Sequence, residues 1–491
     1  MSAWGLGGLL LGRSPALPAQ GNGSRQLVIG VGRDFFDGPD SRTFLHGSTH
    51  TWEGLTYLDE QLRAVPWLAE SWSMTKAGRK WHFQIRPGVH FHDGSPLTTR
   101  EIIASLNRIK GNPKYDPTGI YRNVQKLEAG KPRELIFHLK APSPAFPNLM
   151  AYYSSPVIKP ACFESQGRIT GLVATGPFQV VRIRRGESIT LRAFPDYWGV
   201  KPFFQEILFK TIVDAQSRIM ALMTGEVDAV ADVGGILPEQ VHQLTKDPHI
   251  VIKHQEVATT HYLFFNCRRP PFSKKTTRLW LAGLMEGQIW IKALTQGFSR
   301  PAGDFYTPLA RDWAFGLVHP STGEKPSRPG RVLTLLIHSG TIQRWPYLEL
   351  AQLLQERLNR EGLSTRIQVI EAGPFQEALK KLDFDLVLQP NTLMTGDPDF
   401  FYSYYIYSQG PHNFGYHNQE SDRLILEARQ EMNKQRRRRL YRDLARLINT
   451  DLPVFPLYHD LSIYAHRKTI ERFELDQNFR PDLIRAGRRS S

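Results

Sequence analysis

An alternation of strand and helix patterns late in the chain constrains the fold more than any other feature of the sequence. Short apolar runs typical of strands are separated there by segments with the 3.6-residue period of a helix. In chain order these patterns occupy residues 332–337, 347–358, 366–370, 375–382 and 385–388. Strands that alternate with helices form parallel sheets with helices packed on them, so the sequence predicts an α/β fold.

The segment that follows the last of these strands is a candidate for a ligand-facing edge. Open α/β sheets bind ligands outside the carboxyl ends of their strands, where the connecting loops meet. Residues 389–399 come directly after the last predicted strand. We therefore expect a ligand to approach the sheet at this segment.

A second informative stretch, residues 65–109, begins with strand and turn patterns. Trp81, Phe83 and Ile85 alternate with polar residues, which is the period-2 signature of a half-buried strand. The alternation continues at residues 89–91, which predicts a second short strand. Residues 76–78 before the main strand and 86–88 after it are typical of turns, so the strand is expected to end at both.

A helix is predicted at the end of the same stretch. Asp93 and Gly94 form a tight-turn signal ahead of it. Thr98 or Thr99 can cap the helix, and Glu101 lies in its first turn, where an acidic side chain is favourable. The apolar residues that follow recur with helical spacing, so one face of this helix is expected to be buried.

The stretch also resembles a known family, the extracytoplasmic solute-binding proteins of the oligopeptide, dipeptide and nickel type (family 5), which feed ATP-driven importers. The matching positions are Pro66, Leu68, Ala69, Ser71, Trp72, Gly78, Trp81, Phe83, Arg86, Val89, Phe91, Asp93, Gly94 and Glu101. Further segments that match the family's pattern lie at residues 53–55, 175–178, 195–199, 218–228, 414–422 and 439–448. Ala77 stands where the family usually has aspartate.

The resemblance implies an α/β, two-lobed periplasmic-binding-protein fold of class II, cluster C type, with an extra subdomain in the first lobe. The implied divisions are a signal-like or disordered N-terminus at 1–24, lobe I at 25–260 with the subdomain at about 75–195, lobe II at 261–455, and a return to lobe I with a basic tail at 456–491. Two strands, near residues 257–266 and 453–458, are expected to cross between the lobes.

The implied function is that of the ligand-binding component of an ABC import system. Such a protein captures a peptide-like or metal-chelate solute by lobe closure and delivers it to a membrane permease. The alternative is a ligand-sensing domain of a regulator that shares this fold, but no DNA-binding module is visible in the sequence. Localisation in the periplasm, a monomeric state and the absence of a cofactor are further expectations from the family.

Motifs of the common enzyme classes are missing from the sequence. It contains no Walker loop, no G-x-S-x-G, no H-E-x-x-H and no dinucleotide-binding fingerprint. The acidic pair at Asp397 and Asp399 lies at a proline turn and has no spacing that indicates general acid–base catalysis. We therefore expect a binding protein and not an enzyme.

The resemblance places the determinants of ligand choice in the segment 389–399. Peptide-type relatives carry W-x-x-D-x-x-D-P there, and the first aspartate pairs with the α-ammonium of the peptide. Aligned on Asp397 and Pro398, that aspartate position is Met394 and the tryptophan position is Asn391. A thioether cannot neutralise an ammonium group, so tight binding of unmodified peptides is not expected. A shifted loop in which Asp397 or Asp399 takes over the role is the competing interpretation.

The remaining candidates come from neighbouring segments of the same pattern. The full set of predicted ligand contacts is His50, Thr51, Tyr152, Tyr153, Phe375, Asn391, Thr392, Met394, Thr395, Asp397 and His412. Because nickel-type relatives carry a metal-contacting histidine in the corresponding region, His412 is also the predicted metal ligand. The same relatives use an arginine near residues 150–156, and this chain has none there. An ordinary loop role for the histidines and core packing for the aromatic residues are the simpler alternatives.

Charge and cysteine usage complete the expectations. The formal net charge of +15 invites a nucleic-acid or anionic-membrane interpretation, but the basic residues are scattered and no nucleic-acid-binding motif accompanies them. The run Arg436–Arg439 is interpreted as a solvated helix face, and no nucleic-acid partner is expected. Cys162 and Cys267 lie in different predicted lobes, where a disulfide would lock the hinge, so we expect free, buried thiols.

Overall fold

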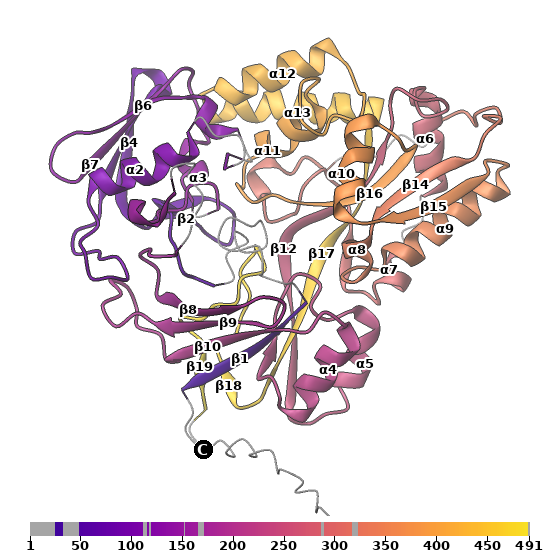
Figure 1. Ribbon diagram of the computed structural model, residues 1–491. Helices are drawn as coiled ribbons and strands as arrows, with labels where there is room; N and C mark the ends of the chain where they lie inside the picture. Colours follow the sequence, from indigo (N-terminus) through magenta and orange to yellow (C-terminus); the bar gives the residue numbers. More distant parts are fainter. Residues whose placement is uncertain are drawn as a thin grey trace, which may run out of the picture.

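A computed structural model of the chain describes residues 25–32, 49–110, 115–116, 119–151, 153–164, 171–285, 289–316 and 323–489. Within them, one large mixed sheet runs through the molecule in the order β15-β14-β16-β12-β17-β11-β1-β10-β9-β8, and β13 pairs with β17 beside this path. One end of the sheet belongs to a lower lobe and the other to an upper right lobe (Figure 1). A smaller sheet, β4-β5-β7-β6, forms a separate unit at the upper left.

The strands of the large sheet are mostly short, with two long exceptions. They are β1 (Gln26–Val31), β8 (Phe178–Arg184), β9 (Ser188–Ala193), β10 (Glu206–Thr211), β11 (Ala229–Val230), β12 (Ile250–Phe265), β13 (Ser299–Pro301), β14 (Leu333–His338), β15 (Thr365–Ile370), β16 (Leu386–Thr392) and β17 (Val454–Arg467). The strands outside it are β2 (Thr56–Leu58), β3 (Ala64–Pro66), β4 (Ala69–Thr75), β5 (Lys80–Ile85), β6 (Val124–Ala129), β7 (Glu134–Leu139), β18 (Ile470–Glu471) and β19 (Gly487–Arg488).

The helices cover the sheets and connect their strands. They are α2 (Thr99–Ile109), α3 (Phe146–Leu149), α4 (Ala215–Thr224), α5 (Val241–Leu244), α6 (Lys275–Leu284), α7 (Ile289–Leu294), α8 (Ser339–Ile342), α9 (Tyr347–Arg360), α10 (Ala372–Lys381), α11 (Asp399–Phe401), α12 (Gln419–Gln430) and α13 (Lys434–Asp451). No helix among the described residues is long and apolar enough to span a membrane.

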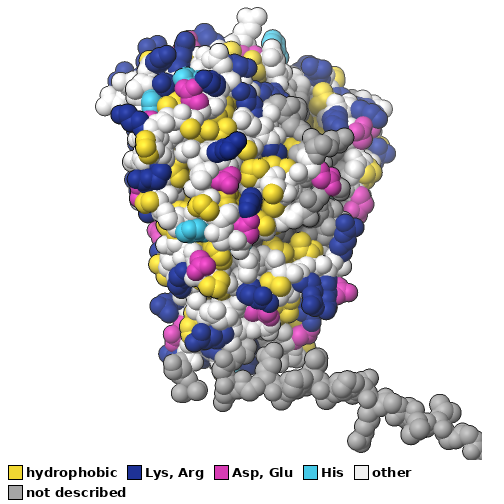
Figure 2. Space-filling view, turned by 60° about the vertical axis from the view of Figure 1, so that its left-hand side comes forward, with side chains coloured by type: hydrophobic (Ala, Val, Ile, Leu, Met, Phe, Trp, Pro, Cys, Tyr) yellow, Lys and Arg dark blue, Asp and Glu magenta, His cyan; other side chains and the backbone are white. Residues whose placement is uncertain are grey.

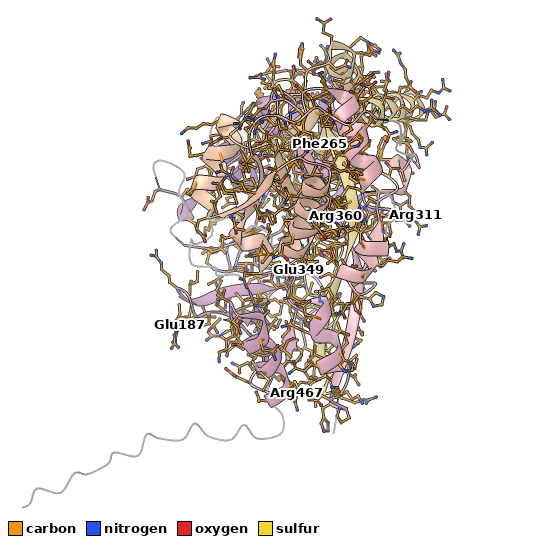
Figure 3. The ribbon with its side chains drawn as sticks, turned by 90° about the vertical axis from the view of Figure 1, so that its right-hand side faces the viewer. Glu187, Phe265, Arg311, Glu349, Arg360 and Arg467 are labelled. Carbon is orange, nitrogen blue, oxygen red and sulfur yellow. The ribbon has the colours of Figure 1, made fainter. Side chains whose placement is uncertain are left out.

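The strands β12 and β17 join the two lobes. They pair antiparallel from Ile250 opposite Arg467 at one end to Phe264 opposite Val454 at the other. Figure 3 shows Phe265 near the top of the molecule and Arg467 near the bottom, so this pair spans both lobes. The expected crossing strands are therefore confirmed, and each is longer than the sequence pattern predicted.

The strand–helix alternation forms the predicted parallel arrangement in the upper lobe. β14 pairs in parallel with both β15 and β16, and α9 and α10 connect the strands. The last strand, β16, continues beyond its predicted end at residue 388 to Thr392. The extension forms because residues 386–392 pair antiparallel with the crossing strand β12. The carboxyl end of β16 therefore lies against the strand that joins the lobes.

The stretch 65–109 forms much of the smaller sheet and the helix packed on it. In β5 the buried residues are Trp81, Phe83 and Ile85, as the alternation predicted. Residues 89–91 do not form the expected second strand, and only a single bridge between His90 and Pro96 is present. The expected subdomain extended to about residue 195, but β8 and β9 pair in the large sheet. The lobe boundaries stay a proposal.

The turn at Lys76–Gly78 has three successive residues with positive φ, at 51°, 51° and 84°. Such a run is unusual for residues with a Cβ, and the φ of 84° favours glycine at residue 78. A Cβ at Gly78 would lie 2.5 Å from the sulfur of Met432, which precedes α13. The turn therefore packs the small sheet against the segment that precedes α13. Ala77, where the family usually has aspartate, lies in this turn.

Charged residues and thiols follow the sequence expectations in part. Lys and Arg side chains are spread over the visible face in Figure 2 and are interspersed with acidic ones.

The two cysteines are free, as expected; Cys162 is buried, whereas Cys267 is only partly buried.

Helix α2 provides a direct test of the local folding rules. Thr98, and not Thr99, is the cap: its side chain accepts from the N–H of Glu101, whose carboxylate accepts from the N–H of Thr98. We expect Thr98→Ala to lower the free energy of unfolding by about 1 kcal/mol, measured by urea titration. Thr99→Ala is the matched control and should change it little, because the capping bonds belong to Thr98. Equal losses in the two variants would contradict this assignment.

Candidate functional site

The predicted ligand-facing edge lies where the two lobes join. Thr392 and Asn391, at the end of β16, pair with Thr259 and Thr260 of the crossing strand β12. The hydroxyl oxygens of Thr392 and Thr259 lie 2.6 Å apart, and the N–H of Leu393 donates to the carbonyl of residue 258 at 2.8 Å. The backbone therefore fixes residues 391–393 directly against a strand shared by both lobes.

Met394 and Thr395 are buried at this edge. Their side chains are 4% and 1% exposed, and the N–H of Met394 donates to the carbonyl of Thr392 at 2.8 Å. The next residue, Gly396, turns the chain with a φ of 65°. The position that would carry the ammonium-binding aspartate is thus filled by a thioether packed within the protein.

The carboxylate of Asp397 is fully occupied by an arginine. Its two oxygens accept from Arg437 on α13 at 2.6 and 2.7 Å, and both side chains are about 95% buried. This bidentate geometry is the strongest form of ion pair between these groups. Burial alone would lower the pKa of Arg437, but the Asp397 carboxylate raises it overall, so the guanidinium keeps its charge.

Asp399 is held in a similar way nearby. Its carboxylate lies 3.2 Å from the Arg429 guanidinium and accepts from the hydroxyl of Ser403 at 2.6 Å. Both acidic side chains of the segment 389–399 therefore have arginine partners from the helices α12 and α13. This arrangement argues against the interpretation in which one of them replaces the missing ammonium partner.

Arg437 also corrects the interpretation of the basic run 436–439. Arg436, Arg438 and Arg439 are exposed, as expected of a solvated helix face. Arg437 is the exception: it is 4% exposed, and its guanidinium lies over the rings of Trp313 and Tyr441 at about 5 Å. The buried face of α13 contains Arg437 because residues 437, 441, 444, 445 and 448 recur with helical spacing and lie on one side of the helix. The buried residues are Arg437, Tyr441, Leu444, Ala445, Ile448 and Asn449.

The histidine and threonine predicted on the first lobe are tied to the C-terminal segment and to a nearby turn. The imidazole of His50 contacts the carbonyl of Pro481 at 2.7 Å and the guanidinium of Arg480 at 3.0 Å. Burial, together with Arg480, holds its pKa well below the usual value. Thr51 is 1% exposed, and its carbonyl accepts from the N–H of Gly176 at 3.0 Å. Both residues make structural contacts within the protein.

Three predicted aromatic contacts have different positions. Phe375 is 3% exposed in the apolar core of the upper lobe, with its ring edge-on to that of His338. Tyr153 is partly buried against the core of the lower lobe. Tyr152 lies outside the described residues. Phe375 thus occupies the core-packing position that was its simpler interpretation.

His412 lies on the upper lobe, in a surface pocket. Its ring stacks on Tyr404 at 4.7 Å, and the pocket is also lined by Arg268, Gln376 and Lys380. In the described part of the chain, no group of three or more His, Cys, Asp or Glu side chains is arranged to hold a metal ion. A metal-binding role for His412 therefore stays a prediction, with cationic side chains as its neighbours.

The crossing strands carry a polar cluster that the sequence pattern did not predict. His261 of β12 is fully buried, stacks on Tyr458 of β17 at 4.1 Å, and bonds to the hydroxyl of Tyr347 at 2.8 Å. Asp460 accepts from the indole N–H of Trp345 at 2.9 Å and lies 3.7 Å from His261. The available signal was a histidine and an aspartate, each beside an aromatic or apolar residue, in the two strands expected to cross between the lobes.

Glu53 was noted only as a family match, yet it is a buried carboxylate. It accepts hydrogen bonds from the indoles of Trp67 and Trp198 at 2.7 and 3.0 Å, and from the hydroxyl of Tyr197 at 2.9 Å. Burial raises its pKa to about 7, and the three donors only partly oppose this effect. The Glu53 carboxylate therefore joins the segment around residue 53 to residues 67 and 197–198.

Comparison with known proteins identifies the class. The model of the bacterial extracellular solute-binding proteins, family 5, matches residues 63–413. The chain is 25% identical to "Di/tripeptide-binding protein 2" of Pseudomonas aeruginosa, with 86% of each chain covered. It is 24% identical to the glutathione-binding protein GsiB of Escherichia coli K12, with 92% of each covered.

Solved structures share the fold at lower sequence identity. DppA of Helicobacter pylori, in complex with the peptide STSA, superposes with a TM-score of 0.79 at 20% identity and covers 93% of this chain and 97% of its own. NikA of Brucella suis, in complex with Fe(III)-EDTA, gives 0.81 at 18% identity and covers 94% and 100%. The predicted two-lobed periplasmic-binding-protein fold is confirmed.

The chain belongs to the bacterial extracellular solute-binding proteins of family 5. Its role as the ligand-binding component of an ABC import system, predicted from the sequence, is confirmed at the level of the family. The alternative of a regulator's sensing domain gains no support from these comparisons.

The Asp397–Arg437 pair should be critical for stability. Asp397→Asn leaves a buried guanidinium without its counter-charge, so we expect the free energy of unfolding to fall by about 3–5 kcal/mol. Glu420→Gln is the matched control, because it makes the same change to the solvent-exposed pair with Arg423 and should have almost no effect. Urea unfolding measures both variants, and a loss as small for Asp397→Asn as for the control would contradict this role.

Glu53 should make stability depend on pH. Its pKa is higher in the folded protein than in the unfolded chain, so the folded state binds the proton more tightly. This contribution is largest below the unfolded pKa and is lost as the pH rises through about 7. Compared with Glu53→Gln, we expect the wild type to lose about 2–3 kcal/mol between pH 5 and pH 8 in urea titrations. A difference between the two proteins that does not change with pH would contradict this.

Proposed function

We propose that the protein binds a small peptide-like or metal-chelate solute between its two lobes, beside residues 391–399, and passes it to a membrane permease. A solute that contacts both lobes can do so only when they are closed, so binding shifts the open–closed equilibrium by its difference in affinity for the two states. The permease would then recognise the closed form. In this proposal lobe I covers residues 25–260 and lobe II residues 261–455.

One observation carries the choice of solute: the edge at 391–399 offers no free carboxylate. Asp397 and Asp399 are neutralised by Arg437 and Arg429, and Met394 is buried. An ammonium group placed at this edge would lose its hydration without gaining a counter-charge. The solute therefore presents a neutral or anionic group there, as a blocked peptide or a metal chelate does.

The names of the relatives support the broader class of peptide-like or metal-chelate solutes. Two of them are named for di/tripeptides and for glutathione, and the solved structures hold a peptide or Fe(III)-EDTA. Among the predicted contacts, Asn391 and Thr392 are the best placed, because their side chains are partly exposed at the junction with β12. His412 would contact a metal only if the solute reached its pocket on the upper lobe.

Further parts of the proposal follow from the family. The protein binds its solute without transforming it, needs no cofactor and acts as a monomer outside the cytoplasm. Residues 1–24, interpreted as a signal-like segment, lie outside the described residues. Fusing this segment to a reporter that is active only outside the cytoplasm tests the localisation.

The proposal predicts weak binding of unmodified tripeptides. In titration calorimetry with trialanine and its N-acetylated form, we expect no sub-micromolar binding of the free peptide and no penalty for acetylation. Loss of a charge-assisted contact is worth about 1.5–3 kcal/mol, or roughly ten- to a hundredfold in affinity. Sub-micromolar binding of free trialanine that acetylation abolishes would contradict the proposed solute class.

Met394 provides the matched pair of variants for the same experiment. Met394→Asp restores a carboxylate at the edge and should improve the binding of free trialanine relative to the acetylated form. Met394→Leu conserves volume without adding charge and should leave the ratio unchanged. A shift of equal size in both variants would show that packing, and not charge, controls the preference.

A further inference from the structure

A leucine of lobe I is buried against lobe II. Leu62 lies at the turn between β2 and β3, with a φ of 60° and 1% exposure. It belongs to the same buried apolar cluster as Leu393 and Tyr402 of lobe II. The fit against the edge loop is close, since a Cβ at Gly396 would lie 2.1 Å from the carbonyl oxygen of Leu62. Only glycine allows this approach.

Asn148 makes a polar bond across the same boundary. This residue of α3 donates from Nδ2 to the carbonyl of Leu62 at 2.8 Å and to the carbonyl of Thr395 at 2.9 Å, while its Oδ1 accepts from the N–H of Ala64 at 3.3 Å. The bonds to residues 62 and 64 stay within lobe I. The bond to Thr395 is the one that connects the lobes. In Figure 1, α3 and β2 lie on the side of the subdomain that faces α11.

The partner loop on lobe II is held firmly. Leu393 is bonded to the crossing strand β12, and Asp397 is bonded to Arg437. Leu62 and Asn148 therefore contact the edge at residues 391–399 where its backbone is fixed by the rest of lobe II. Separation of the lobes would expose the Leu62 side chain to water and would remove a hydrogen-bond donor from the buried carbonyl of Thr395.

We propose that Leu62 and Asn148 form a latch that holds the lobes closed over residues 391–399 and sets the balance between the open and closed states. In the proposed solute-binding function, the latch controls affinity and release. This part of the inference rests on that proposed function. Weakening the latch shifts the protein towards the open state and speeds release of the solute. The apparent affinity falls in proportion to the fraction of molecules in the closed, binding-competent state. Both residues act as positioning residues.

The test measures lobe separation without any solute. Spin labels are placed on cysteines introduced at the exposed residues Val213 of lobe I and Val369 of lobe II, with Cys162 and Cys267 replaced by alanine. Pulsed electron resonance then gives the distance distribution of the full chain. We expect Leu62→Ser and Asn148→Ala each to move the distribution to longer distances. Unchanged distributions in both variants would overturn the latch.

Matched controls separate opening from general destabilisation. Leu68→Ala removes a fully buried leucine inside the subdomain core, and Asn123→Ala removes an amide whose bonds to residue 141 stay within the subdomain. Both should lower thermal stability without changing the distance. If they open the protein as much as the latch variants do, the latch is overturned. Failure of the solute proposal would appear in calorimetry and would leave these distances unaffected.

Asn148→Asp keeps the proposal testable if Leu62→Ser folds poorly. The carboxylate can still accept from the N–H of Ala64 but cannot donate to Thr395. The bond to the carbonyl of Leu62 is lost as well, while the Leu62 side chain itself is unchanged. We expect this variant to move the distance distribution to longer distances. With a bound solute, roughly tenfold weaker apparent affinity is expected for the latch variants.

Discussion

The antiparallel pairing of β12 with β17 is the constraint on which the rest of the structure depends. These strands lie at the centre of the large sheet that runs through both lobes, so the other strands of that sheet are placed relative to them. The parallel unit β14–β16 joins the pair through β16, and the lower lobe joins it through β11. One consequence is that the carboxyl end of β16, the natural ligand edge of such a sheet, lies at the junction of the lobes.

At that junction, charge is neutralised from within the protein. The acidic residues of the edge pair with arginines of α12 and α13, although the chain as a whole carries a large positive charge. The buried pair Asp397–Arg437 stabilises the shape of the loop only while both partners are present. The same pairing removes the free carboxylates that would select a cationic solute, so stability of the loop and choice of solute depend on the same contacts.

Local patterns predicted much of this fold from the sequence. The alternation at 81–85, the cap at Thr98 and the unit at 332–388 depend on neighbours in sequence, and the structure confirms them. The pairs Asp397–Arg437, His261–Asp460 and Asn148–Thr395 could not be predicted, because each joins residues brought together only by the fold. The interpretation of the basic run 436–439 as a solvated face is wrong at Arg437 alone for the same reason, because its partner Asp397 is distant in sequence.

We propose that the lobes close over a solute that presents no cationic group to the edge at residues 391–399. Native mass spectrometry of the freshly purified full-length protein tests it most directly, because it weighs whatever co-purifies. The account predicts a bound species whose fragmentation identifies a blocked peptide or a metal chelate. A population of unmodified peptides with free amino termini would contradict it.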